Sequence, residues 1–185
     1  AIEAGDEKVF TILKDSASGT HEIGSMGRHV TRALLIANKP EAWEFVEKLL
    51  LAAQRQEGLR QVILETIDET HPEAFRRMIK LIKDENLVRF AAVIRAVDVW
   101  FGFNFETGEE KKVNKLLEQV ISFLESIQIR QDALSSDDAE TVYLALWASA
   151  FEDAMKTVEI AKPLLNHSKV EIRYVTTNLL AQLDL

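Results

Sequence analysis

Apolar residues recur at helical three-and-four spacing along most of the chain, and the broadest of these stripes lies near its middle. Over residues 86–101 the stripe widens beyond one side of a helix through Leu87, Phe90, Ala91, Val93, Ile94, Val97, Trp100 and Phe101. A helix with so broad an apolar face needs neighbours on more than one side. The stretch 86–101 is therefore predicted to be the central helix of the fold.

The same spacing predicts about ten helices joined by short connections. Before the central helix they cover residues 6–14, 20–38, 40–53, 59–68 and 72–82. After it, the longest covers residues 109–130, and the others end at Phe151, at Leu165 and at Leu185. Gly58 is predicted to separate two helices, and Ser136 or Asp137 to cap the helix that ends at Phe151.

The composition favours an all-α fold. The 185 residues include only 3 prolines and 7 glycines, whereas a fold of strands and turns needs frequent turn residues. Hydrophobic residues make up 47% and charged residues 28%, which is typical of a folded domain. A chain of this length can hold one core or one uninterrupted stack of repeats.

Two helix starts compare well across the chain. Leu87-Val-Arg89 and Glu171-Ile-Arg173 place their arginines 84 positions apart, which equals two repeats of the length found in HEAT proteins, about 40–47 residues. This pattern, with the segment 166–173, resembles the HEAT/armadillo family of helical repeats. The resemblance implies an α-solenoid of about five antiparallel helix pairs over residues 20–185, with residues 1–19 as a partial leading helix and linker.

The chain also resembles the repeat segments of large uncharacterised bacterial proteins, which implies that it is part of a longer polypeptide. An apolar stripe formed by Leu179, Leu180, Leu183 and Leu185 leads to a related expectation. Because a terminal repeat normally needs a polar outer face, either the chain continues beyond this helix or the helix mediates self-association.

Charge and cysteine content exclude several classes of function. The net charge of −8 opposes binding to nucleic acid or to an anionic membrane. The absence of cysteine excludes disulfides and thiolate metal sites. No apolar run approaches the roughly 20 residues that span a bilayer, and the first residues do not look like a signal peptide. A cytoplasmic location is expected.

No catalytic, metal or cofactor site is predicted. The four histidines, His21, His29, His71 and His167, are far apart and form no ligand motif. The glycine pairs lack the lysine or the preceding strand of a phosphate-binding loop. Asp98 beside Trp100 is the exception among the carboxylates. HEAT-like alkylpurine DNA glycosylases use tryptophans and an aspartate, so an enzyme of that type is the alternative; the other reading is that Asp98 bonds a neighbouring helix or Arg95.

Arginines on the second helices of the predicted pairs could line the inner surface of the stack and accept an acidic peptide. They are Arg28, Arg32, Arg60, Arg89, Arg95 and Arg173. The competing interpretation is that they form salt bridges between repeats, with Glu65, Asp68 or Asp98 as partners.

The connection after the central helix is unusually aromatic, because Phe103 and Phe105 follow Trp100 and Phe101. These rings either fold back into a local core or stand exposed as an anchor for a partner. The function predicted from the sequence is a non-catalytic scaffold that binds a protein or peptide, or the neighbouring repeats of its own chain.

Overall fold

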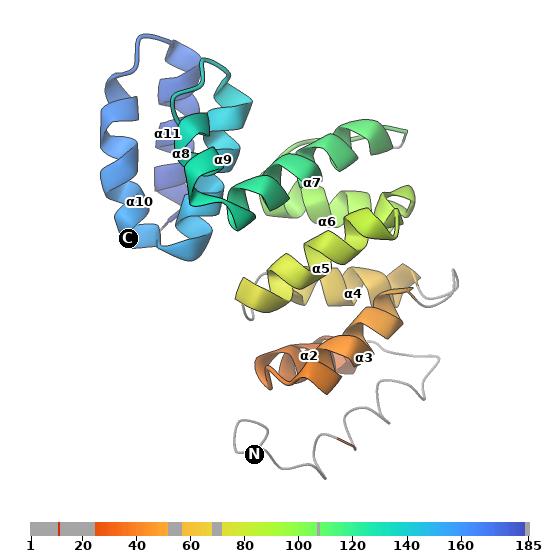
Figure 1. Ribbon diagram of the computed structural model, residues 1–185. Coiled ribbons are helices and arrows are strands. Elements are labelled where there is room, and N and C mark those ends of the chain that lie inside the picture. Colours follow the sequence, from red (N-terminus) through yellow and green to blue (C-terminus); the bar gives the residue numbers. More distant parts are fainter. Residues whose placement is uncertain (1–10, 12–24, 52–56, 68–71, 107, 184–185) are drawn as a thin grey trace. The chain divides into compact units, whose positions relative to one another are not determined.

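The computed structural model describes residues 11, 25–51, 57–67, 72–106 and 108–183, and all regular structure within them is helical (Figure 1). Ten α-helices and two short 3₁₀ helices are present in these ranges, without a strand. The predicted all-α class is confirmed. The predicted helix over residues 6–14 falls outside the described residues, apart from Thr11.

The chain forms two compact units, residues 1–114 and residues 115–185, called unit 1 and unit 2 below. Unit 1 contains α2 (Ser25–Ile36), α3 (Pro40–Leu51), α4 (Glu57–Ile67), α5 (Pro72–Asp84), the 3₁₀ helix η2 (Leu87–Arg89) and α6 (Ala91–Phe101). The helix α7 (Glu110–Glu125) begins in unit 1 and ends in unit 2. Unit 2 continues with α8 (Ile127–Ala133), α9 (Ala139–Glu152), α10 (Ala154–Ala161), η3 (Lys162–Asn166) and α11 (Val170–Gln182).

The helices of unit 1 pack in an alternating order. α4 packs against both α2 and α6, while α3 packs against α5. Pro40 and Pro72 stand at the first positions of α3 and α5, where the missing N–H costs no hydrogen bond. Both starts agree with the sequence prediction.

The inward faces of α5 and α6 form part of the core of unit 1, to which α2, α3 and α4 also contribute buried side chains. Phe75 on α5 meets Trp100 on α6 edge to face, with 5.3 Å between ring centroids. Both rings are buried, as are Met78 and Val97. Arg77 of α5 forms an ion pair with Glu47 of α3, which links these two helices. The hydrogen bond between the two side chains raises the pKa of Arg77.

The predicted central helix over residues 86–101 is not continuous. Leu87–Arg89 form a 3₁₀ turn, Phe90 is extended with φ −94° and ψ 131°, and α6 begins only at Ala91. The spacing of the apolar residues did not predict this break, because the 3₁₀ turn also buries Leu87 and Val88. Neither glycine nor proline marks the break.

Unit 2 is organised around α9, which packs against α8, α10 and α11. Its core cluster combines Val142 and Leu146 of α9 with Ala161 of α10 and with Ile172 and Leu179 of α11. Because α9 has neighbours on several sides, its sequence is apolar nearly all round.

Three further boundaries differ from the prediction. The long helix over residues 109–130 breaks at Ser126, which is extended and whose hydroxyl accepts a hydrogen bond from the Ile129 N–H. Ile127, which follows the break, is 62% exposed. The cap of α9 is Asp138, rather than Ser136 or Asp137, and its bonds to Thr141 lower the pKa of its carboxyl. Gly58 lies in the first turn of α4 and does not separate helices.

Candidate interaction surface

The outward-facing side of α6 carries a narrow stripe at helical spacing. Ala91, Arg95 and Val99 are exposed, and Asp98 beside them is half-buried. Val99 is 75% exposed, the most exposed of the large hydrophobic side chains in the described residues. These four residues are called the outer stripe of α6.

The aromatic connection doubles back onto this stripe. Gly102 ends α6 with φ 73°, a left-handed conformation that suits glycine, and its N–H donates to the Asp98 carbonyl at 2.7 Å. The Phe105 N–H then donates to Asp98 Oδ1 at 2.9 Å. The sequence predicted that Asp98 bonds either a neighbouring helix or Arg95, whereas the structure shows a bond to the backbone of the loop.

A second carboxylate holds the next amide of the loop. Glu109 Oε2 accepts from the Glu106 N–H at 3.0 Å. The carboxylate also pairs with Lys112, and this bond, followed by the Glu106 amide, lowers the pKa of Glu109. Two successive amides are therefore fixed by two carboxylates from opposite ends of the loop.

The fixed loop presents two stacked rings. The centroids of Phe103 and Phe105 lie 5.8 Å apart, with their planes inclined by 23°. Both side chains are half-buried, so they are neither core nor fully exposed. Trp100 and Phe101, in contrast, are buried at 8% and 2% exposure. Of the four aromatic candidates, only the Phe103–Phe105 pair reaches the surface.

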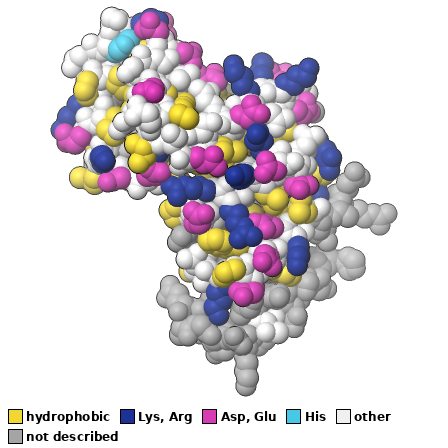
Figure 2. Space-filling view, viewed as in Figure 1, with side chains coloured by type: hydrophobic (Ala, Val, Ile, Leu, Met, Phe, Trp, Pro, Cys, Tyr) yellow, Lys and Arg dark blue, Asp and Glu magenta, His cyan; other side chains and the backbone are white. Residues whose placement is uncertain are grey.

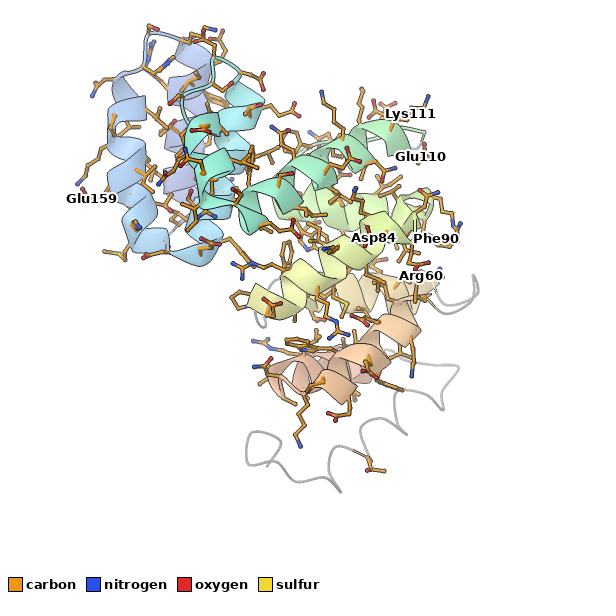
Figure 3. The ribbon with its side chains drawn as sticks, viewed as in Figure 1. Arg60, Asp84, Phe90, Glu110, Lys111 and Glu159 are labelled. Carbon is orange, nitrogen blue, oxygen red and sulfur yellow. The ribbon has the colours of Figure 1, made fainter. Side chains whose placement is uncertain are left out.

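The predicted arginine ladder loses one of its members. Arg60 is 1% exposed, and its Nε donates to the Leu50 carbonyl at 2.9 Å. Its guanidinium carbon lies 3.8 Å from the centroid of the Phe90 ring, and Figure 3 shows the two side chains together. Arg60 is therefore a structural residue and cannot meet a ligand at an open surface.

The other arginines are dispersed. Arg32 on α2 and Arg95 on α6 are exposed, and Arg89 is exposed on η2 instead of on a second helix. Arg173 donates to the carbonyls of His167 and Ser168 at 2.7 and 3.0 Å, which fixes the turn before α11. The side chain of Arg28 lies outside the described part of the chain, so its predicted role stays a prediction.

Sequence reasoning missed the buried arginine of unit 2. Arg130 is 6% exposed, and it bonds both the Phe123 carbonyl and the carboxylate of Glu152. In the sequence, Arg130 was distinguished only as a charged residue in the last turn of the long helix predicted over residues 109–130.

The described residues hold no group of three or more His, Asp or Glu side chains that could bind a metal ion. His29 is exposed and His167 is half-buried, while His21 and His71 lie outside the described ranges. Figure 2 shows basic and acidic side chains interspersed on the visible face of each unit. None of the described helices combines the length and apolarity needed to cross a bilayer.

The C-terminal stripe packs largely inward where it is described. Leu179 is buried and Leu180 packs against the core cluster of unit 2, whereas Leu185 lies beyond the described residues. The outer side of α11 instead exposes Val170 and Tyr174, at 58% and 66%.

Comparison with known proteins places the chain in a family without assigning it an activity. No curated protein and no solved structure matches it. One family model matches residues 1–185, the whole of the sequence. The chain therefore belongs to the family described as a family of unknown function, DUF5724.

Proposed function

We propose that this chain is a non-catalytic helical-repeat module that binds a protein partner through the outer stripe of α6 and the Phe103–Phe105 pair. The observation that carries the proposal is the exposed Val99 beside a stacked aromatic pair that two carboxylates hold in place. Apolar and aromatic side chains at a surface are the usual anchors of protein interfaces.

The packing order of unit 1 supports the repeat character. In an α-solenoid each helix meets the helix two places along as well as its immediate neighbour, because pairs stack on pairs. The contacts of α4 with both α2 and α6, and of α3 with α5, follow that rule.

Fixation of the loop supports binding without large rearrangement. A loop that is already ordered loses less conformational entropy when a partner docks, so more of the contact energy appears as affinity. Arg95 lies one turn before Val99 on the same stripe and is exposed. A partner that combines an apolar group with a nearby carboxylate would complement this surface.

The enzymatic alternative depends on Trp100 and Asp98. Trp100 is buried against Phe75, and Asp98 accepts the Phe105 amide, so both residues have structural roles in this proposal. With both residues engaged in packing and in the loop, the binding module is the function that the geometry supports best.

The proposal is tested by a charge placed at the centre of the surface. Val99→Asp should leave the far-ultraviolet circular dichroism and the melting temperature unchanged, because the side chain is 75% exposed. It should weaken capture of a specific partner by roughly tenfold or more, about 1.4 kcal/mol. Capture from an extract of the source organism, followed by mass spectrometry, measures this loss.

The matched control is Val170→Asp, because Val170 is a second exposed valine on a helix and lies in unit 2. A partner retained by this control and lost with Val99→Asp supports the proposal. Equal retention of every captured protein by both variants contradicts it.

A further inference from the structure

The outer stripe of α6 carries one cation and one carboxylate less than one helical turn apart. Arg95 is exposed and pairs with no acid among the described residues. Asp98 accepts the Phe105 N–H with Oδ1, at 2.9 Å, and its Oδ2 accepts no bond from the described residues. The stripe therefore offers a positive group and a negative group, and an inverted copy of the same stripe would complement both.

The stripe also contains a knob and a hole of matching kind. Val99 is the knob, at 75% exposure. A knob of one helix packs between four residues of the facing helix, at spacing i, i+3, i+4 and i+7. The stripe has this spacing at Ala91, Ile94, Arg95 and Asp98. Ala91 is small and Ile94 is only 5% exposed, so Ile94 forms the floor of the hole.

An antiparallel copy of α6 satisfies shape and charge together. When Val99 of one copy lies over the hole of the other, Arg95 lies at the level of Asp98 in the facing helix. A two-fold axis makes every contact reciprocal, so this single register forms two ion pairs and covers two valines. A parallel pair would instead place Arg95 beside Arg95, and like charges repel.

The two ends of the stripe suit the same register. Gly102 follows the stripe and Ala91 begins it, so two small residues face each other and the backbones can approach closely. The Phe103–Phe105 pair of one copy then lies at the level of η2 in the other, where Arg89 is exposed. A guanidinium near an aromatic face is attracted to it.

We propose that the partner of this surface is a second copy of the chain, bound antiparallel through α6. The inference rests on the function proposed above and names its partner, because Val99 and Asp98 of the second copy supply the apolar group and the carboxylate. α6 is 11 residues long. A contact along it falls below the roughly 800 Å² per partner of a standard interface, so the dimer is weak and dissociates on dilution.

Sedimentation velocity of the full chain measures this self-association. The sedimentation coefficient should rise towards that of a dimer between about 5 μM and about 500 μM, the range expected of a weak complex. A monomer throughout this range would overturn the inference. The function proposed above would survive that result if Val99→Asp still released a different protein.

Charge reversal tests the two ion pairs. Arg95→Glu should weaken the dimer about tenfold or more, whereas Lys111→Glu, at an exposed position of α7 (Figure 3), should leave it unchanged. Asp98→Lys should weaken it as well, in part through the loop. An equal mixture of the Arg95 and Asp98 variants should associate again, because each reversed side chain then meets the other. Equal affinities of the Arg95 and Lys111 variants, or a mixture no tighter than its components, would overturn the proposal.

Single cysteines test the register, because the chain has none of its own. In the proposed pair the two copies of position 99 lie about 7 Å apart along the helix axis, and those of position 91 about 17 Å apart. Under oxidation with copper phenanthroline, Val99→Cys should form a disulfide-linked dimer faster than Ala91→Cys and faster than the exposed control Val170→Cys. Equal rates at positions 99 and 91 would contradict the antiparallel register. The fastest rate at position 170 would place self-association on α11 and would overturn the proposal.

Discussion

Arg60 of unit 1 and Arg130 of unit 2 are both buried, and each caps the carboxyl end of a helix. Arg60 donates to the carbonyl of Leu50 in the last turn of α3, and Arg130 to that of Phe123 in the last turn of α7. The last carbonyls of a helix have no partner within it. Each arginine supplies the missing donor.

The two arginines differ in what compensates their charge. The guanidinium of Arg60 lies over the ring of Phe90, whereas that of Arg130 is paired with Glu152. A buried charge is costly unless it is compensated. The face of an aromatic ring lies against the guanidinium in unit 1, and a carboxylate lies against it in unit 2.

Arg60→Met is expected to have the largest effect on stability. Methionine fills much of the space but leaves the Leu50 carbonyl unsatisfied at a fully buried position. The lost bond costs about 1–3 kcal/mol, and a desolvated cation–π contact adds about 2 kcal/mol. Urea unfolding should show a loss of about 3 kcal/mol.

The control for this variant is Arg95→Met, which alters an exposed arginine and should change stability by about 0.5 kcal/mol or less. Similar losses in the two variants would mean that the buried arginine does not cap α3.

Arg130→Met should cost less, about 2 kcal/mol, because the side chain of Glu152 is 27% exposed and can be hydrated after its partner is removed. Combined with Glu152→Gln, the losses should be less than additive by about 1 kcal/mol. A double-mutant cycle by urea unfolding measures this coupling. Strict additivity would show that the ion pair does not contribute, and the contrast between the units would then disappear.

The sequence predicted the helices of unit 1 best where a local signal coincided with the apolar period. Pro40 and Pro72 mark helix starts that the structure reproduces, because proline favours the first helical position whatever surrounds it. The breaks at Phe90 and Ser126 escaped prediction. Periodicity records which residues are apolar, and the 3₁₀ turn buries its apolar residues as a helix would.

The candidate sites were also predicted only in part. The alternation of Phe103 and Phe105 drew attention to the loop, and the loop does bring them to the surface as a stacked pair. The burial of Arg60 could not be predicted from its neighbours in sequence, because its partners include a carbonyl of α3 and the ring of Phe90. A charged residue within a helical apolar pattern is predicted to be exposed unless its partner in the folded structure is known.

The smallest expected effect concerns the opposite kind of cap, in which a carboxylate holds an amide. Bonds to Lys112 and to the Glu106 amide keep the pKa of Glu109 below its ordinary value of 4.5. A lowered folded pKa means that the contribution to stability is complete above pH 4.5 and is lost as the pH falls through the folded value. The Glu106 amide resonance should move in that acid range.

Glu109→Gln provides the control, because it removes the ionisable carboxyl and should abolish this acid transition. A Glu106 resonance that still titrates in the glutamine variant would assign the transition to another group.

The cap on α7 also determines which substitutions the chain can accept over time. Arg130 binds a backbone oxygen at position 123, and every amino acid supplies that oxygen, so the cap places no demand on the side chain there. Glu152 contributes its own carboxylate, so positions 130 and 152 are linked and a change at one favours a change at the other. Within the family, the backbone contact would leave little statistical trace between positions 123 and 130, while the ion pair would appear as correlated variation between positions 130 and 152.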